Sequence, residues 1–385
     1  MVLADRARKE AAACDEAVAC GAGTGPLHGV RRLRAAGAVI VGTTRMPEFG
    51  AFPYTESDAY GITRNPWQRT RTPGGSSGGT AVAVITGMVA AGLGGDGGGS
   101  IRIPSACCGL FGLKPQRGRV TSAPEPHLWW ALGTSGPLTR SVLDSAIVYD
   151  VIRGNVDTDL FRAGATESFV AAASREPGRL RIGWSVKPVV TGVRPDPIHV
   201  QAVEETARLL GDLGHDVREV DPAYPDPSAA FVPQFFAGIR TCADSVEHVD
   251  RLERRTRETC RLGAWVTPRV RDWAIRHGER VAAKANRIFD DLDVLLTPTI
   301  ARRPPPMGVL SGVGSVRSSL RAMPAIAYVA LWNVAGNPAA AIPCGLGPDG
   351  LPTSVQLVGR TDGEATLLSR AAQREAALPR PLTVP

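Results

Sequence analysis

The sequence predicts an α/β fold on three observations. Segments with helical periodicity alternate with short runs of β-branched and apolar residues. Of the 385 residues, 43% are hydrophobic and 21% are charged, which is enough apolar material for one large or two ordinary domains. The 43 glycines and 31 prolines lack the every-third-residue repeat of collagen, so they indicate many tight turns.

The N-terminal part of the chain contains two predicted helices and a predicted strand. Residues 4–19 are rich in alanine and carry charges at helical spacing, and the glycines at 21–25 end that helix. Residues 30–37 predict a second helix that ends at a glycine, and the β-branched run 38–41 predicts a short buried strand. A helix followed directly by a strand is typical of an α/β chain.

A glycine-rich region at 70–118 follows. It predicts a helix of small residues between two glycine loops that carry serines. The alternation of helices and strands then resumes, without an internal repeat. The predicted elements are a helix at 136–151, a strand at 180–184, a helix at 199–214, a strand at 217–220, charged helices within 244–292, and strands at 294–296, 339–345 and 354–360.

Charge is spread along the whole chain. Basic residues number 44 against 37 acidic ones, for a net charge of +7, and all but four of the basic residues are arginines. A nucleic-acid-binding protein gathers its positive charge into one stripe or tail. We therefore expect no nucleic-acid partner.

The cysteines and the N-terminus bear on the compartment. Seven cysteines form no CxxC pair and no metal-like spacing with histidine, which predicts reduced thiols. The first ten residues are charged, and no window is apolar for long enough to span a membrane. We expect a cytoplasmic protein with no membrane partner. The sequence has neither a ligand cluster nor a phosphate-binding fingerprint, so we expect no metal and no organic cofactor.

The second glycine loop carries a candidate nucleophile, Ser100. Three glycines, Gly97, Gly98 and Gly99, precede it, so successive backbone N–H groups can face one concavity. A serine that attacks a carbonyl creates an oxyanion, which such N–H groups stabilise. Ser100 is therefore predicted to lie beside its own oxyanion hole.

The first glycine loop, GGSSGG, holds Ser76 and Ser77. Glycines on both sides allow an unusual backbone conformation, and a hydroxyl there is suited to relaying protons. A phosphate-binding loop has a similar composition. That alternative fails because no GK[ST] follows and no lysine is near.

These loops resemble the amidase signature family. The similarity covers nearly every position of TPGGSSGG at 72–79 and of GGDGGGSIRIPSACCGLFGLKPQRGRV at 94–120. It extends to flanking segments, so most of the chain is covered. These segments are 32–42, 46–49, 60–67, 291–299, 336–345 and 354–360.

The resemblance implies a single domain over residues 1–385, with a large mixed β-sheet covered by α-helices on both faces. Residues 70–120 would form the signature core, and residues 180–385 would complete the sheet and its helical cover. The implied activity is amide hydrolysis by a Ser, cis-Ser, Lys triad. In it Ser100 attacks the carbonyl, while Ser76, which follows a cis peptide bond, relays protons.

Other family positions also have counterparts. The backbone N–H groups of Gly97 to Ser100 would form the oxyanion hole. Ser77, Asp96 and Arg102 match positions that support the loops through hydrogen bonds, and Arg102 is placed to form a charge-assisted pair with Asp96.

The lysine of the family has no counterpart. It lies in a segment resembling V-x-K-D upstream of the first serine, but here PLHGV at 26–30 is followed at once by RRLRAAGAV, which looks like an internal deletion. TTR at 43–45 also replaces the usual K-T-N. The lysines of this chain, none of which matches, are Lys9, Lys114, Lys187 and Lys284. The proton of Ser100 therefore lacks an evident acceptor.

His127 is a candidate substitute base or pocket residue, because neutral histidine is the usual base near pH 7. Its neighbours Trp129, Trp130 and Leu132 are candidates for an acyl or aromatic pocket or for the core. Further candidate bases are Glu48 and Asp58.

Three functions fit these residues. The first is an amidase-type hydrolase or acyl-transfer enzyme that acts on a small-molecule amide or ester through Ser100, with an altered proton path. The second is a catalytically silent relative, a pseudoenzyme that binds a ligand in the same pocket. The third is reuse of the fold for another reaction, such as amide formation or cyclisation. The sequence leaves open whether the chain forms a homodimer.

Overall fold

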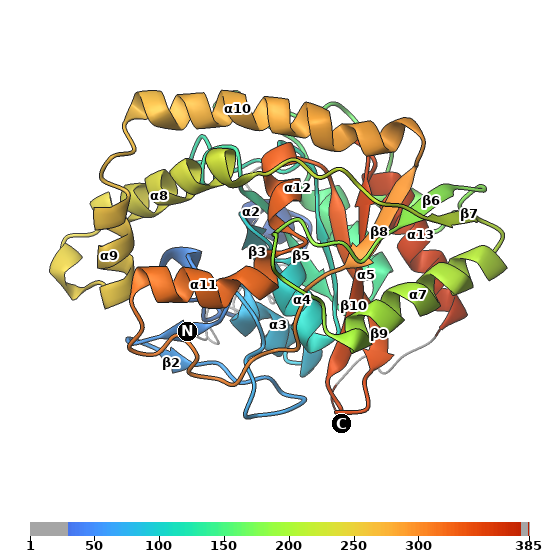
Figure 1. Cartoon of the computed structure of the whole chain (residues 1–385), viewed down its shortest axis with the longest axis horizontal. Coiled ribbons are helices and arrows are strands. Elements are labelled where there is room, and N and C mark those ends of the chain that lie inside the picture. Colours follow the sequence, from blue (N-terminus) through green and yellow to red (C-terminus); the bar gives the residue numbers. More distant parts are fainter. Residues whose placement is uncertain (1–29, 379–383, 385) are drawn as a thin grey trace, which may run out of the picture.

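The computed structural model describes residues 30–378 and residue 384 (Figure 1). The predicted helix at 4–19 lies outside the described residues. The predicted helix at 30–37 is confirmed as α2 (Val30–Ala35). A 3-10 turn, η1 (Glu48–Gly50), and the hairpin of β1 (Glu56–Ser57) and β2 (Gly61–Ile62) follow before the glycine-rich region.

One eight-stranded sheet holds the rest of the chain together, in the order β3-β5-β4-β9-β10-β8-β6-β7. The strands are β3 (Ala91–Asp96), β4 (Phe111–Lys114), β5 (Thr134–Thr139), β6 (Arg181–Trp184), β7 (Asp216–Glu219), β8 (Val294–Pro298), β9 (Ala339–Leu346) and β10 (Pro352–Gly359). From β3 to β8 neighbouring strands are antiparallel, whereas β6 is parallel to both β8 and β7. The predicted mixed sheet is therefore confirmed, and β6 to β10 complete it.

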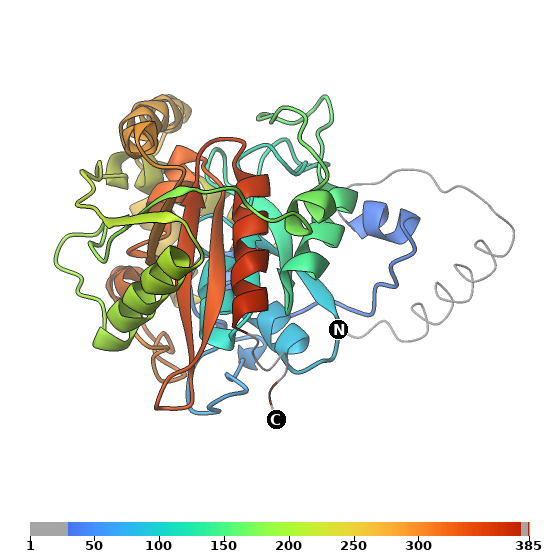
Figure 2. The same ribbon diagram turned by 90° about the vertical axis from the view of Figure 1, so that its right-hand side faces the viewer.

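Helices cover both faces of this sheet (Figures 1 and 2). On one face the apolar core joins the strands to α5 (Val142–Ile152), α6 (Phe169–Ala173), α7 (Pro197–Asp212) and α13 (Glu364–Ala377). On the other face the core joins them to α8 (Ser228–Asp244), α10 (Pro268–Asn286) and α12 (Ala330–Ala335). Strand β8 shows why, because Val294 and Leu296 enter the first core and Leu295 enters the second.

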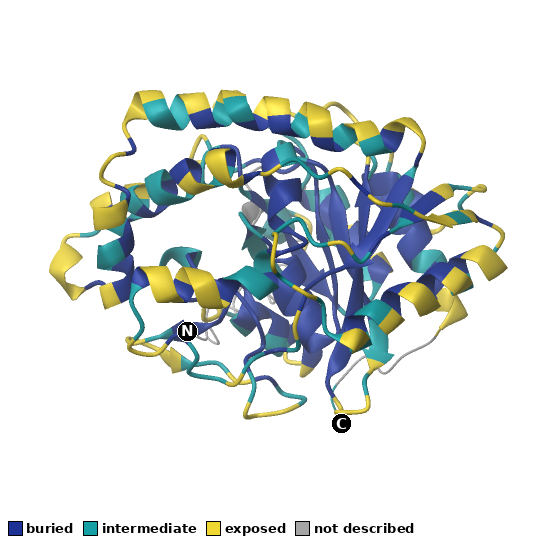
Figure 3. Ribbon diagram, viewed as in Figure 1, coloured by how far each residue is buried: buried dark blue, intermediate teal, exposed yellow. Residues whose placement is uncertain are grey.

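Four further helices and two 3-10 turns complete the described chain. They are α3 (Gly78–Ile85), α4 (Arg102–Cys108), α9 (Arg254–Leu262) and α11 (Ser315–Ile326), with the 3-10 turns η2 (Val249–Arg251) and η3 (Arg287–Asp290). The small-residue helix that the sequence predicts is thus α3, and α4 follows the second loop directly. Figure 3 shows that the central strands β4, β8 and β10 are buried, whereas α10 alternates between buried and exposed positions. None of the helices in the described part of the chain is both long and apolar enough to cross a membrane.

The predicted strand at 38–41 is wrong. No strand of the described residues includes this run, and the side chains of Val39 and Val41 are 37% and 43% exposed. A β-branched run becomes a buried strand only where a neighbouring strand pairs with it. Here the run does not pair with β3, the strand at that end of the sheet.

The predicted helix at 136–151 is half wrong. Residues 134–139 form β5, and the helix begins only at Val142. The helix boundary is the N-cap Ser141, whose hydroxyl accepts a hydrogen bond from the backbone N–H of Asp144. Residues before that cap are free to extend, and they pair with both β3 and β4.

Candidate active site

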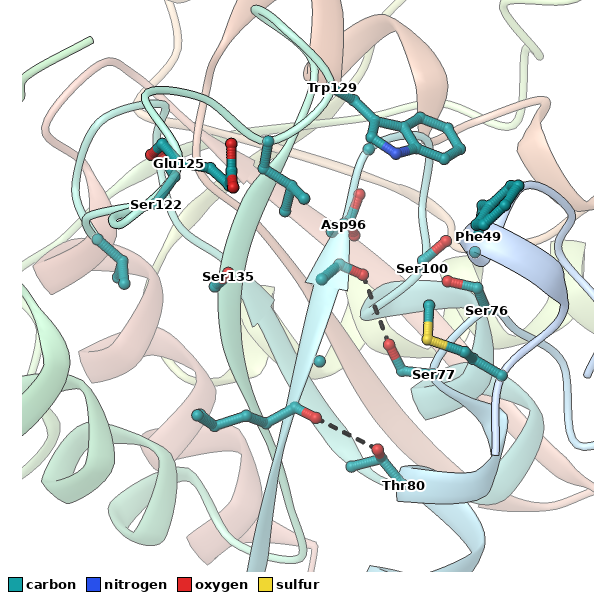
Figure 4. Close-up of a pocket in the computed structure, with 18 of the residues that line it drawn as sticks. Phe49, Ser76, Ser77, Thr80, Asp96, Ser100, Ser122, Glu125, Trp129 and Ser135 are labelled. Atoms are coloured by element: carbon teal, nitrogen blue, oxygen red, sulfur yellow. Dashed lines mark hydrogen bonds between the residues drawn. The ribbon is translucent and has the colours of Figure 1, made fainter. Parts of the chain in front are cut away.

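A cavity of about 490 Å³ lies where the two glycine loops meet. Residues 44–50 line it beside Ser76 and Ser77, and β3 lines it together with Ser100. The segment 120–129 forms a further wall. Figure 4 shows Ser76, Ser77 and Ser100 grouped at one end, with Ser122 and Glu125 at the other.

The first loop brings Ser76 and Ser77 against the second one. The peptide bond between Gly75 and Ser76 is cis, and the backbone N–H of Ser77 donates to the carbonyl oxygen of Ser100 at 3.3 Å. Helix α3 starts immediately afterwards. A Cβ atom on Gly78 would lie 2.2 Å from the Thr55 hydroxyl, so only glycine permits this close approach.

The second loop is shaped by the carboxylate of Asp96. Its Oδ1 accepts from the N–H of Gly99 at 2.7 Å and its Oδ2 accepts from the N–H of Ile101 at 3.2 Å. Gly99 has φ of +119°, which a side chain would strain, and its N–H is already occupied by the carboxylate. Gly99 is therefore a correction to the predicted oxyanion hole, and the available N–H groups are those of Gly97, Gly98 and Ser100.

Asp96 forms a fully buried ion pair with Arg102. Arg102 Nε lies 2.9 Å from Asp96 Oδ2, and Nη2 lies 3.0 Å from Oδ1, so the pair is bidentate. Burial opposes the charge of Asp96, yet the charge and hydrogen bonds of Arg102 outweigh it and lower the pKa of this carboxyl to about 2. Asp96 is thus ionised and holds the loop in place.

Two residues far along the chain complete this network. Asn333 accepts from Arg102 at 2.6 Å and donates to Asp96 at 2.8 Å, and Gln356 accepts from Arg102 at 2.8 Å. Sequence reasoning missed both. Each is a buried amide side chain within a largely apolar segment, Asn333 in ALWNVA and Gln356 in SVQLVG. A buried polar side chain requires a hydrogen-bond partner, so this pattern is the feature of the sequence that could have indicated them.

His127 lines the cavity, but its ring is held from two sides. Nδ1 accepts a hydrogen bond from the backbone N–H of Trp130 at 3.2 Å, and the ring stacks on the Trp130 indole at 3.9 Å. Arg271 lies on the same indole at 3.8 Å. Burial, followed by the charge of Arg271, lowers the pKa of His127 below its usual value.

Of the other residues predicted to form the pocket, some line the cavity and others lie elsewhere. Trp129 lines the cavity and packs against Phe235, whereas Leu132 belongs to the buried core and Trp130 lies behind His127. The candidates Glu48 and Asp58 do not line the cavity. Both instead form hydrogen bonds with Glu253. Glu125, which sequence reasoning missed, lines the cavity.

No lysine is present among the described residues that line the cavity. Lys114 is buried in β4, where its Nζ donates to the carbonyl of Pro115 at 2.8 Å. Burial, with the charge of Arg102, lowers the pKa of Lys114 to about 7. Lys187 pairs with Asp221 on the surface, and Lys284 lies near the end of α10. In the described ranges no group of three or more His, Cys, Asp or Glu side chains is arranged to hold a metal.

Comparison with known proteins decides the family. The Amidase family model matches residues 28–368. The chain belongs to the amidase signature family. "Putative amidase AmiB2" of Mycobacterium tuberculosis is 48% identical over 361 residues, which are 93% of this chain and 76% of the relative. The 6-aminohexanoate-cyclic-dimer hydrolase of Pseudomonas sp. strain NK87 is 34% identical and is aligned over 91% of this chain and 76% of its own length.

Solved structures of the amidase signature family share the fold. A 6-aminohexanoate cyclic dimer hydrolase complexed with substrate superimposes with a TM-score of 0.85 at 33% identity, over 91% of this chain and 77% of that one. A bacterial aryl acylamidase of the amidase signature family gives 0.83 at 25% identity, over 98% and 88%. The cavity described above is thus the candidate active site of a family member.

Proposed function

We propose that this chain hydrolyses a carboxylic amide, and the corresponding ester, through an acyl-enzyme on Ser100. One observation carries the proposal: Ser100 and Ser76 line one cavity together with Gly97, the first glycine of the run that precedes Ser100. A nucleophile needs a neighbouring proton acceptor and donors for the oxyanion. The family supports the same reaction, because two similar proteins are named as a 6-aminohexanoate-cyclic-dimer hydrolase and an aryl acylamidase.

The reaction has a proton path that uses only the two serines. Ser100 Oγ attacks the carbonyl carbon and forms a C–O bond, while its proton passes to Ser76 Oγ. Ser76 gives its own proton to the amide nitrogen, the C–N bond breaks, and a neutral amine leaves. Water then hydrolyses the ester, with protons moving in reverse. Without a lysine on the cavity wall this relay is slower than a full triad.

A silent ligand-binding protein is the second candidate. Two observations favour it: no described residue of the cavity wall is a lysine, and the available nitrogen of neutral His127 carries a proton, because Nδ1 already accepts from Trp130. Retention of the whole Asp96 and Arg102 network is equally consistent with a protein that only binds its ligand.

Labelling by a fluorophosphonate distinguishes the two. The probe phosphonylates an activated serine without requiring a particular substrate. We expect one adduct by intact mass, located at Ser100 by peptide mapping, and lost in Ser100→Ala. Ser174→Ala, at the exposed end of α6, is the matched control and keeps the adduct. A folded protein that takes no adduct contradicts the proposed function and supports the binding protein.

A further inference from the structure

The outer edge of β3 forms one wall of the serine cavity. β3 is the terminal strand of the sheet, with β5 on one side and no strand of the described chain on the other. Residues 93–97 line the cavity consecutively, and residues 44–46 line another wall. The free edge of a strand carries N–H and C=O groups that can pair with an added strand.

The backbone groups of Leu93 and Gly95 point to this free edge. Their carbonyl oxygens accept from the hydroxyls of Thr80 at 3.2 Å and Ser77 at 3.5 Å, which project from α3 and its N-cap (Figure 4). The residue opposite Leu93 in β5 is Pro137, which has no N–H to offer. Within one strand residue the N–H and C=O point the same way. The two N–H groups therefore also face outward, and neither has a hydrogen-bond partner within residues 30–378.

We propose that this edge binds the backbone of the substrate, an extended polyamide such as a peptide. Two of its carbonyl oxygens would accept from the N–H groups of Leu93 and Gly95, as in the addition of a strand to a sheet. Donors two residues apart repeat at about 6.6 Å, which is the spacing of alternate carbonyls in an extended peptide. This inference rests on the proposed function and names its substrate class.

The direction of β3 connects this edge to the nucleophile. The strand ends at Asp96, and the chain continues through Gly97 to Ser100, all three of which line the same cavity. A bound strand would thus extend from Leu93 toward Ser100. Apolar walls formed by Val120 and Ile152 favour neutral, apolar side chains on the ligand.

Hydrogen exchange tests the pairing directly. The probe is N-acetyl-tetraalanine amide, and the control is N-acetylalanine amide, which is too short to reach both donors. We expect the longer peptide to slow exchange of the Leu93 and Gly95 amides in Ser100→Ala protein, which cannot consume it. Unchanged exchange at both amides overturns the proposal. Full protection without peptide also overturns it, because another segment or a second copy would then occupy the edge.

A pair of esters tests the same contact during acylation. They are p-nitrophenyl acetate and the p-nitrophenyl ester of N-acetyl-trialanine, and the readout is the ratio of their acylation rates. Leu93→Pro removes one outward N–H at a position where an edge strand tolerates proline, and Leu93→Ala removes only the side chain. The ratio is the acylation rate of the trialanine ester divided by that of the acetate ester. We expect it to fall about tenfold in Leu93→Pro, which corresponds to the loss of one or two net hydrogen bonds, and to stay unchanged in Leu93→Ala.

The outcomes separate this inference from the proposed function. If neither ester nor fluorophosphonate modifies Ser100, the proposed function fails, and exchange protection still reports whether the edge binds a polyamide. If Ser100 reacts and the exchange of both amides is unchanged, only the strand pairing fails. If Leu93→Pro does not fold, the exchange measurement decides alone.

Discussion

The backbone N–H of Trp130 donates a hydrogen bond to Nδ1 of His127 at 3.2 Å. Neutral imidazole has one N–H and one bare nitrogen, so this contact fixes the proton on Nε2. Nε2 is then a donor, and Nδ1, the nitrogen able to take a proton, is already in use. His127 is thus better placed to donate a hydrogen bond to a ligand than to activate Ser100.

We expect His127→Gln to change the rate of Ser100 labelling by no more than about threefold, whereas loss of a general base costs several orders of magnitude. Glutamine keeps a donor at the ring's outer position. The tautomer itself is measured by nitrogen-15 NMR of the imidazole. A labelling rate lower by about a hundredfold or more is the size of effect expected when a general base is removed, and it would show that His127 is the base.

Small alkylamines should accelerate the reaction of Ser100. The cavity of about 490 Å³ has no lysine among its described lining residues, so it can admit a neutral amine beside Ser76. The rate of fluorophosphonate labelling should rise with the free-base concentration of ethylamine. Tetramethylammonium, which has no basic nitrogen, is the control. An equal effect of ethylamine and tetramethylammonium, or no effect of ethylamine, would contradict a missing base.

Breaking the buried ion pair should unfold or strongly weaken the protein. Arg102→Met leaves the Asp96 carboxylate buried without its partner, which costs about 3–5 kcal/mol of the free energy of unfolding. Urea unfolding measures this loss. The matched control is Glu167→Gln, which breaks the exposed pair of Glu167 and Arg175 and should leave the free energy of unfolding nearly unchanged. Equal losses in the two variants would refute the role given to Asp96.

Acid should destabilise the fold through His199. Burial, with the nearby charge of Arg303, lowers its pKa to about 4, below the value of about 6.5 in an unfolded chain. Between these two pKa values only the unfolded chain binds the proton. The contribution of His199 to the free energy of unfolding is therefore complete above pH 6.5, and it is lost at about 1.4 kcal/mol per pH unit as the pH falls toward 4. Urea unfolding at several pH values measures how steeply the free energy of unfolding changes with pH. This dependence should be weaker in His199→Leu than in His248→Leu, which changes an exposed histidine and serves as the control. The same pH dependence in both variants would show that His199 is not the group responsible.

The sequence predicts most elements whose signals are local. Helix α7 and strands β6 to β10 follow from periodicity alone, and the glycine loops place Ser76 and Ser100 on one cavity. The helix predicted from residue 136 fails because its first residues are recruited by β3 and β4, partners that no local window contains.

The composition of the site was less predictable. Whether Gly99 points its N–H to an oxyanion or to Asp96 depends on loop geometry, which three identical glycines do not encode. The tautomer of His127 depends in the same way on Trp130, whose φ is +58°. Such orientations arise from tertiary contacts. The sequence therefore indicates which residues lie in the site, but not where their N–H groups and ring nitrogens point.

The supports of the loop that carries Ser100 are made late. Arg102 contacts Asn333 and Gln356, which lie 231 and 254 residues further along the chain. During synthesis from the N-terminus, the loop that carries Ser100 is therefore complete long before its polar braces leave the ribosome. A nascent chain halted before α12 lacks both Asn333 and Gln356, so Asp96 is the one side-chain partner that Arg102 keeps among those described above. Completion of the hydrogen bonds around the loop that carries Ser100 is thus expected to be one of the last events in the synthesis of the polypeptide.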